Sequence, residues 1–495
     1  MQQYLKLNQE NLFRLPAGIM TPGYDRRQVK AGIIHIGVGA FHRSHQAYYT
    51  DLILRDKKNS NWGICGIALL ESDMRNYTAL AAQDGLYTLT VAKPDGSSET
   101  IVPGSLIEYM FAPENPDAVI EKIANPDIKI ITLTITEGGY NFNTAGEFLL
   151  NETSVQWDIS HPAQPKTVFG YLAMGLKRRM ERSLKGLTIQ SCDNIQKNGD
   201  LLKRMLLSFI KVSDPGLVAW VEKEVTFPNS MVDRITPAAT ETDTEYIRNA
   251  FGIEDRCPVV CEPFVQWVIE DNYAQGRPDW ESAGVQFADD VAPFEKMKIR
   301  LLNAGHSLLG FLGVLHGYTY IHEVVNDPVF ARLLRDFMDN EVTPVLDEVP
   351  GTDLSRYKDS LLERFGNPRI RDKVARICQQ SSAKIPKFLL PTIHDQLRRG
   401  APVERSALVI AAWCRYAEGF DENGSKYQIE DEMSDILQEK AIASHLNPLA
   451  FLEIEKVFGD IIRSERFTKA YLRSLNCLYH KGAAACAGES VDISF

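Results

Sequence analysis

Residues 31–54 read AGIIHIGVGAFHRSHQAYYTDLIL, a stretch that predicts a strand, a glycine turn and a helix in that order. The apolar run 33–36 is the strand, and the residues after the turn have helical periodicity. In the turn, Gly37 and Gly39 match the first two glycines of a dinucleotide-binding fingerprint, which requires this context. His42 holds the third glycine position, so the fingerprint is incomplete and a plain glycine turn is the alternative.

Strand patterns recur through the first half of the chain. Residues 62–70, 128–136 and 187–194 are apolar or β-branched runs that end in polar residues, with helical patterns between them. Residues 87–102 read as a hairpin that turns at Asp95. Strands that alternate with helices predict a doubly wound α/β domain of the Rossmann type.

Convincing strand patterns disappear after about residue 290, where helical periodicity dominates. We therefore predict two domains. The first, over 1–288, is a Rossmann-type dinucleotide-binding domain with insertions, and the second, over 289–495, is a mainly α-helical substrate and catalytic domain.

The composition limits the partners of the protein. The chain has 495 residues, a formal net charge of −11 and no long basic run, which argues against nucleic acid and anionic membranes. We expect no secretory signal, and no stretch reaches the roughly 18 uncharged apolar residues of a membrane helix. The eight cysteines show neither CxxC nor zinc-ligand spacing. We predict a reduced, cytoplasmic protein with ordinary buried thiols and no bound metal.

Residues 294–309 read FEKMKIRLLNAGHSLL and predict one amphipathic helix with a K-x4-N-x2-H motif. With Lys298 at zero and about 100° per residue, Glu295 lies near 60°, His306 near 80° and Asn303 near 140°. A lysine whose charged form is disfavoured by burial can act as a general base, and amide and imidazole groups can hold a reacting oxygen. The alternative is the polar outer face of an ordinary surface helix.

Polar residues that follow the predicted strands are the candidates for cofactor binding. Glu71, after the second strand, can accept hydrogen bonds from ribose hydroxyls and repel a 2′-phosphate, which favours NAD over NADP. The nearby Asp73 is explained more simply as a helix cap. The predicted cofactor-binding residues are Gly37, Gly39, Ala40, Phe41, Glu71, Thr136 and Glu137.

Four more polar residues lie among apolar neighbours. Asn194 follows the strand pattern 187–194, at the carboxyl edge where ligands collect, and a turn-forming asparagine is its alternative. Asp233, Arg376 and Lys384 are either ligand-binding groups or surface charges and structural ion pairs.

Seven segments resemble the polyol-specific long-chain dehydrogenase/reductase family, and within it the mannitol 2-dehydrogenases. In chain order they are GVGAFHRSHQ, TLTITEGGY, SCDNIQKNG, FPNSMVDRITP, EPFVQWVIEDN, KMKIRLLNAGH and SSAKIPKFLLP. The resemblance covers nearly the whole chain. It implies an NAD-binding N-terminal domain, a mainly helical C-terminal domain and a site between them. It also implies a monomer that interconverts D-mannitol and D-fructose by zinc-independent hydride transfer.

The resemblance also implies roles for individual residues. In the family the motif lysine, here Lys298, is the general base, and the two asparagines Asn194 and Asn303 form an oxyanion hole. His306 then positions the substrate oxygen, and Glu295 relays the proton to solvent. The positions that hold the sugar hydroxyls correspond to Asp233, Arg376 and Lys384.

The chain departs from the family pattern at two places. The usual N-G-S-H reads Asn303-Ala304-Gly305-His306, and Ser72 stands where some relatives carry a second acidic residue, which softens the expected preference for NAD. Sister enzymes reduce fructuronate or tagaturonate, and others oxidise D-arabinitol. Arg376 favours the mannitol type, but an arginine also binds carboxylates well, so a uronate stays open. The rivals from other classes are a silent NAD-binding regulator and a zinc-dependent dehydrogenase.

Overall fold

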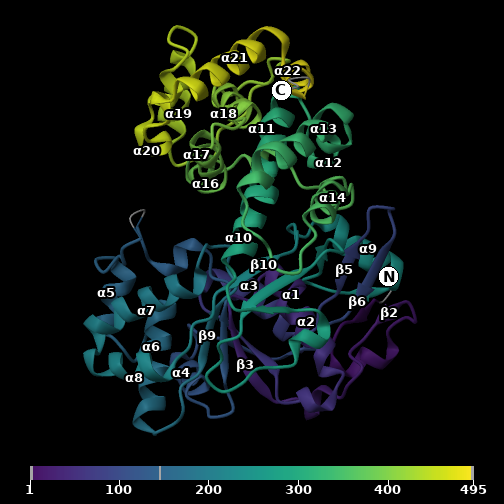
Figure 1. Cartoon of the computed structure of the whole chain (residues 1–495). Helices are drawn as coiled ribbons and strands as arrows, with labels where there is room; N and C mark the ends of the chain where they lie inside the picture. The colour runs from purple at the N-terminus through teal and green to yellow at the C-terminus, as the bar shows by residue number, and fades with distance from the viewer. Residues whose placement is uncertain (1–3, 144–145, 492–495) are drawn as a thin grey trace. The chain divides into compact units, whose positions relative to one another are not determined.

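The computed structural model of the protein describes residues 4–143 and 146–491. The chain divides into two compact units (Figure 1). The first consists of Met1–Lys93 and Ser97–Ala292, and the second of Pro94–Gly96 and Pro293–Phe495. The domain boundary expected after residue 288 stays a prediction.

A five-stranded, all-parallel sheet is the centre of the first unit, with strand order β7-β4-β3-β8-β9. The chain starts in the middle at β3, builds outward through β4 and β7, and then crosses to β8 and β9 on the other side. This is the doubly wound Rossmann order, so the predicted α/β fold is confirmed. The strands are β3 (Ala31–Ile36), β4 (Gly63–Ala68), β7 (Leu106–Phe111), β8 (Ile130–Leu133) and β9 (Thr188–Ser191).

Alternate side chains of β3 enter two different cores. Ile34 and Ile36 pack in the core that α4, α6 and α7 cover, whereas Ile33 packs in the core that includes α2 and α3. Helices therefore cover both faces of the sheet, as Figure 1 shows. The helices of this unit are α1 (Ala40–Ser44), α2 (Gln46–Leu54), α3 (Met74–Ala81), α4 (Pro116–Ile123), α5 (Thr153–Ser160), α6 (Val168–Glu181), α7 (Asn198–Ser213), α8 (Val218–Glu224) and α9 (Glu241–Phe251).

Smaller sheets complete the first unit, in the orders β12-β5-β6-β2, β10-β13-β14 and β1-β11. The predicted hairpin is confirmed, because β5 pairs antiparallel with β6. The remaining strands are β1 (Leu5–Lys6), β2 (Ile19–Met20), β5 (Leu89–Ala92), β6 (Ser98–Ile101), β10 (Ser230–Asp233), β11 (Ile253–Glu254), β12 (Val259–Cys261), β13 (Gln266–Glu270) and β14 (Gln286–Ala288).

The second unit is helical: among the residues described from 293 to 491 there is no strand, only isolated bridges. Its buried helix α11 packs against α18, α15, α12 and α22. The helices are α10 (Ala292–Lys298), α11 (Ala304–His316), α12 (Ile321–Asn326), α13 (Pro328–Phe337), α14 (Leu354–Phe365), α15 (Val374–Ile377), α16 (Ser381–Phe388), α17 (Leu390–Arg398), α18 (Glu404–Tyr416), α19 (Ser434–Ala443), α20 (Glu455–Phe458), α21 (Glu465–Lys481) and α22 (Ala483–Val491), with π-helical turns at η8 (Ile299–Asn303) and η9 (Met338–Val342).

Two of the cysteines differ from the sequence prediction of free thiols. Cys477 on α21 and Cys486 on α22 form a disulfide, with their Cα atoms 5.8 Å apart. The chain turns between the two helices at Gly482, whose φ of 82° only glycine adopts easily. A separation of nine residues gives no sign of this turn, so the sequence could not reveal the pair. The other six cysteines are buried thiols.

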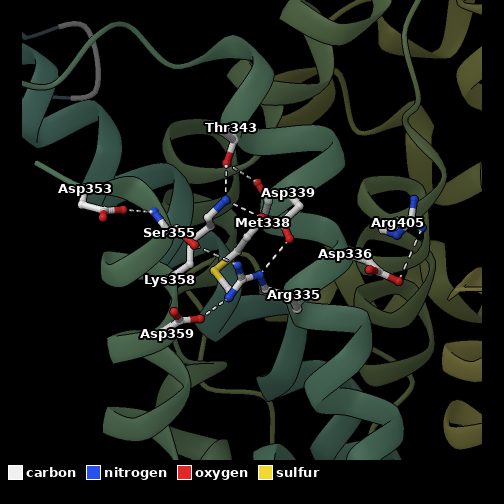
Figure 2. A network of polar contacts seen from close by, with 10 residues as sticks. All are labelled: Arg335, Asp336, Met338, Asp339, Thr343, Asp353, Ser355, Lys358, Asp359 and Arg405. Atoms are coloured by element: carbon white, nitrogen blue, oxygen red, sulfur yellow. Dashed lines mark hydrogen bonds and ion pairs between the residues drawn. The ribbon is translucent and has the colours of Figure 1, made fainter.

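A network of charged side chains joins α13 to α14 (Figure 2). Lys358 on α14 is buried, and its ammonium group donates to the Asp339 carboxylate and, at 3.3 Å, to Thr343 Oγ1. Arg335 on α13 donates to the other Asp339 oxygen through Nε at 2.7 Å. Asp339 lies in the π-helical turn η9 and accepts hydrogen bonds from both cationic side chains, so it connects α13 to α14.

The Asp339 carboxylate should stabilise the fold in a pH-dependent way. Burial alone would raise the pKa of Asp339, but hydrogen bonds from Lys358 and Arg335, with their positive charges, lower this pKa on balance. A carboxyl group with a lowered pKa in the folded chain stabilises the fold above its unfolded pKa. It loses this contribution as the pH falls through the folded pKa.

We therefore expect Asp339→Asn to lower the free energy of unfolding by about 1–3 kcal/mol at neutral pH, because it leaves buried Lys358 without its counter-ion. The loss should shrink in acid, as the pH falls below the usual aspartate pKa of about 3.9, because the wild-type carboxyl group then becomes protonated as well. Denaturant unfolding at both pH values measures the effect. Asp347→Asn, which breaks an exposed pair with Lys296, is the control. Equal losses in the two variants would contradict the assignment.

Candidate active site

Gly37 directly follows β3 and makes the tight turn expected of the first fingerprint glycine. Its φ is 93°, and a Cβ atom there would lie 2.1 Å from the Thr134 carbonyl oxygen. The Gly37 carbonyl accepts a hydrogen bond from Thr134 Oγ1 at 2.6 Å, which ties the turn to the end of β8. A Cβ on Gly39, in contrast, would approach only the Gly37 carbonyl oxygen, at 3.9 Å. The backbone over Gly39 is therefore open to close approach by a ligand.

This open backbone fits the pyrophosphate of a dinucleotide. Gly39 is the N-cap residue of α1, and the first helical residues are Ala40 and Phe41. Gly39 has no side chain that could accept hydrogen bonds from the first turn, so the N–H groups of this turn can face an anionic group. The predicted glycine turn thus has the geometry that dinucleotide binding requires.

His42 occupies the position of the third fingerprint glycine, and its ring stacks on a side chain of β3. Its ring lies on the ring of His35 with centroids 3.4 Å apart, and both rings are buried. His35 Nε2 lies 3.2 Å from the Gly37 carbonyl oxygen and 2.9 Å from Thr134 Oγ1. Burial lowers the pKa of His35 to about 3 and that of His42 well below its usual value, so both rings are neutral. Two flat neutral rings provide the close helix–strand packing that a glycine normally allows.

Glu71 and Asp73 follow β4 and have different environments. Asp73 is the N-cap residue of α3, as expected, but its side chain does not cap that helix. Its Oδ2 instead accepts hydrogen bonds from the amides of Leu69 and Leu70 at 3.1 and 2.9 Å and so closes the preceding turn. Glu71 is exposed, and its carboxylate has no hydrogen bond or ion pair with any residue in the described ranges. Of the two acids, Glu71 thus has the more accessible carboxylate.

Asp193 fixes the segment that carries Thr136 and Glu137. Thr136 has a φ of 60°, a strained value for a β-branched residue. Asp193 holds it there by accepting hydrogen bonds from the Thr136 amide at 2.9 Å and the Ile135 amide at 3.0 Å. Burial raises the pKa of Asp193, although these hydrogen bonds and one from Tyr140 oppose the rise. Sequence reasoning missed Asp193, whose only signal was an acid directly after a buried strand.

Asn198 links the segments that carry Asn194 and Asp233. From the start of α7 it donates to the Asp193 carbonyl at 3.1 Å and to the Ser230 carbonyl at 2.8 Å. It also accepts from the Ser230 amide at 2.9 Å. Ser230 begins β10 and the buried Asp233 ends it. Asn198 therefore holds the segment that carries Asn194 against this strand. This residue was also missed from the sequence.

The helix predicted over 294–309 contains a π-helical turn. α10 ends at Lys298, the π turn runs from Ile299 to Asn303, and α11 begins at Ala304. The Ala304 amide donates to the Ile299 carbonyl, five residues back. The prediction of one regular α-helix is therefore wrong. A π turn contains one extra residue, so every residue after it is rotated back by about 100°.

The rotation aligns the motif more closely than a regular helix would. With Lys298 at zero, Asn303 moves from near 140° to about 40°, and His306 from near 80° to about −20°. Lys298, Asn303 and Glu295 are buried, with 7, 9 and 7% of their surface exposed. The His306 ring stacks on Phe365 at the end of α14, with centroids 4.1 Å apart. The three motif residues and Glu295 thus form one mostly buried polar strip, which we call the lysine strip.

Arg376 and Lys384 lie near each other in the second unit. Arg376 donates through Nε and Nη2 to the two oxygens of Asp372 at 2.7 and 2.6 Å. Lys384 donates to the Ile377 carbonyl at 3.3 Å. Burial, followed by the positive charge of Arg376, lowers the pKa of Lys384. Asp372 was not singled out from the sequence, although its i, i+4 spacing to Arg376 is a signal for such a pair.

The predicted residues therefore form two groups. Gly37, Glu71, Thr136 and Asn194 follow four parallel strands, whose carboxyl ends meet at one edge of the sheet. The lysine strip and the Arg376–Lys384 pair belong to the second unit. Contacts between the two groups stay predictions.

Membrane and metal features can be stated for the described ranges only. Within 4–143 and 146–491, no helix has the length and apolar character needed to cross a bilayer. In the same ranges, no three or more His, Cys, Asp or Glu side chains are grouped so that they could hold a metal ion.

Comparison with known proteins gives the same family along the whole chain. Residues 31–282 match the model of the mannitol dehydrogenase Rossmann domain, and residues 290–479 match that of the mannitol dehydrogenase C-terminal domain. Mannitol dehydrogenase 2 of Saccharomyces cerevisiae is 45% identical, over 98% of this chain and 97% of its own. Mannitol 2-dehydrogenase of Neosartorya fischeri is 43% identical, over 99% of each chain.

Two solved structures are similar over nearly their full length. The Pseudomonas fluorescens mannitol 2-dehydrogenase, a ternary complex with NAD and D-mannitol, has a TM-score of 0.89 and 42% identity, covering 99% of this chain and 100% of that one. A D-sorbitol dehydrogenase in substrate-free form has a TM-score of 0.91 and 36% identity, covering 97% of this chain and 100% of that one.

Proposed function

Because the chain belongs to the mannitol dehydrogenase family, we propose that it interconverts D-mannitol and D-fructose with NAD(H) as cofactor. The observation that carries the proposal is the similarity, over nearly the whole chain, to an enzyme whose structure holds NAD and D-mannitol. The buried lysine–asparagine–histidine strip supports it, because this set can hold and deprotonate a secondary alcohol.

The first unit would hold the cofactor. The open backbone at Gly39, with the first amides of α1 at Ala40 and Phe41, would hold the pyrophosphate, and the Glu71 carboxylate would accept hydrogen bonds from the ribose hydroxyls. Thr136 and Glu137, held by Asp193, belong to the same edge of the sheet. When bound, NAD supplies the hydride acceptor for alcohol oxidation and NADH the donor for the reverse reaction.

The second unit would supply the proton chemistry. Lys298, which is buried, takes the C2 hydroxyl proton of mannitol as the C2 hydride leaves, the role of a general base. The amides of Asn303 and Asn194 stabilise the negative charge that develops on the C2 oxygen, and His306 positions that oxygen. Glu295, one helical turn before Lys298, passes the proton to water. In fructose reduction the lysine is the acid.

Substrate hydroxyls would be held by Asp233, Arg376 and Lys384, which offer one acceptor and two donors. Within the same family, a fructuronate or tagaturonate reductase and a D-arabinitol dehydrogenase are the alternatives. The similarity to a D-sorbitol dehydrogenase adds that polyol to the substrates worth testing. We further propose that the protein is a cytoplasmic monomer that binds, besides the cofactor, only the small polyol or ketose.

A spectrophotometric assay tests the proposed function. We expect rapid oxidation of NADH with D-fructose, and slower reaction with NADPH because the Glu71 carboxylate repels its 2′-phosphate. D-mannitol should be oxidised faster than D-sorbitol or D-arabinitol, and incubation with a chelator should not change the rate. Faster reduction of fructuronate than of fructose would favour the alternative. Loss of activity on chelation would favour a zinc enzyme, and cofactor binding without turnover would indicate a regulator.

A further inference from the structure

The Arg376 guanidinium is already occupied by a buried carboxylate of its own chain. Asp372 precedes α15 and has only 3% of its surface exposed. Its two oxygens accept from Nε and Nη2 of Arg376 at 2.7 and 2.6 Å. The arginine side chain is more open, with 60% of its surface exposed. A largely exposed cation is thus paired, along one edge, with a fully buried anion.

This pairing uses one of the two edges through which an arginine recognises carboxylates. Two parallel N–H donors on one edge of the guanidinium form a fork that matches the two oxygens of a carboxylate. In this chain the fork formed by Nε and Nη2 is closed by Asp372, and the positive charge is compensated. The edge between Nη1 and Nη2 keeps two N–H donors, but because the Asp372 carboxylate already compensates the positive charge, these donors suit neutral hydroxyl groups better than a second carboxylate.

The neighbouring cation does not restore an anion site. Lys384 approaches Arg376, and burial together with the arginine charge disfavours its ammonium form. It also donates to the Ile377 carbonyl at 3.3 Å. A ligand carboxylate would therefore meet Arg376, whose charge Asp372 compensates, and Lys384, whose ammonium form is disfavoured. The negative charge of Asp372 would also repel the ligand carboxylate and lower its affinity.

We propose that Asp372 determines the substrate class by occupying one forked edge of Arg376 and compensating its positive charge, so that the arginine binds the hydroxyls of neutral polyols and ketoses and rejects sugar acids. Asp372 acts through Arg376 and is a positioning residue. This inference rests on the proposed function, because it takes Arg376 as a substrate-binding residue.

The test is the ratio of kcat/KM for D-fructuronate to that for D-fructose. Asp372→Asn keeps the size of the side chain but removes its negative charge and one of the two oxygens that accept from Arg376. We expect it to raise this ratio at least about tenfold over wild type. Asp372→Glu, which keeps the charge, should leave the ratio near the wild-type value. The double variant Asp372→Asn with Arg376→Ala should lose the gain, because the arginine provides the new carboxylate contact.

Asp359→Asn is the matched control, since it removes an acid from another arginine pair, that of Arg335. It should leave the ratio unchanged. An unchanged ratio in Asp372→Asn would overturn the inference. Arg376→Ala separates the two possible failures. If it raises KM for fructose while Asp372→Asn has no effect on the ratio, only the inference fails. If it leaves KM unchanged, the substrate role of Arg376 in the proposed function fails, and the inference fails with it.

Wild-type protein provides a measurement that does not depend on the folding of a variant. D-gluconate has the hydroxyl chain of a polyol and a terminal carboxylate. We expect it to inhibit D-mannitol oxidation competitively, with an inhibition constant at least about tenfold above KM for D-mannitol. Inhibition by gluconate at or below that KM would overturn the inference.

Discussion

Replacing Lys298 with alanine is expected to lower kcat for D-mannitol oxidation by about 10²–10⁴-fold, the usual cost of losing a positioned general base. The affinity for NADH should change little, because the lysine lies in the second unit and the cofactor edge in the first. A small primary amine added to Lys298→Ala should restore part of the rate. Such rescue indicates lost proton transfer, whereas a damaged fold would not respond to the amine.

Lys296→Ala is the matched control for this experiment. Lys296 lies two residues away on the same helix, is partly exposed and pairs with the exposed Asp347 at 2.9 Å. Its loss should change kcat less than about twofold, as for other surface ion pairs. Near-normal turnover of Lys298→Ala, or equal losses in the two variants, would show that Lys298 is not the base.

Replacing Gly37 with alanine is expected to damage both stability and cofactor binding. The new Cβ would lie 2.1 Å from the Thr134 carbonyl oxygen, and the φ of 93° is strained for any residue with a Cβ. The two effects together should lower the free energy of unfolding by about 2–5 kcal/mol. Since the turn must shift to relieve the clash, NADH affinity should fall at least about tenfold. Thermal unfolding and fluorescence titration with NADH measure the two effects.

Substitutions at two other glycines distinguish the effect of backbone strain from the effect of a steric clash. Gly252 also has a positive φ, 66°, but a Cβ there would have no neighbour within 4 Å, so Gly252→Ala should cost only about 1–2 kcal/mol. Gly39→Ala should leave stability nearly unchanged and weaken NADH binding, because its Cβ would project into the open space over the turn. If Gly37→Ala were as stable as Gly252→Ala, the close approach to Thr134 would not be what requires glycine.

The sheet was predictable because its strands are encoded locally. The β-branched run 128–136 can be buried on both faces only as a central parallel strand, and it contains β8. The turn at Gly37 was predictable for the same reason, because a glycine between a strand and a helix indicates a tight turn. His42 was understood only from the structure, because its stacking partner His35 comes from the neighbouring strand.

The arrangement within the site was harder to predict. The π turn at 299–303 leaves the apolar pattern of the sequence almost unchanged, so the spacing alone suggested a regular helix. Asp193 acts through a partner that the fold supplies, the strained segment at Thr136, whereas Asp372 pairs with Arg376 four residues along, and that spacing could have revealed it. The sequence thus identified residue types that suit polyol oxidation, whereas their support depends on tertiary contacts.

The most direct test of the central claim is a crystal structure of the protein with NAD and D-mannitol, in which the distance from Lys298 Nζ to the C2 oxygen is measured. We predict a hydrogen-bond distance of about 2.6–3.2 Å, with the side-chain amides of Asn194 and Asn303 directed at the same oxygen. A C2 oxygen bound by other groups, with Lys298 Nζ directed away from it, would contradict the proposed mechanism.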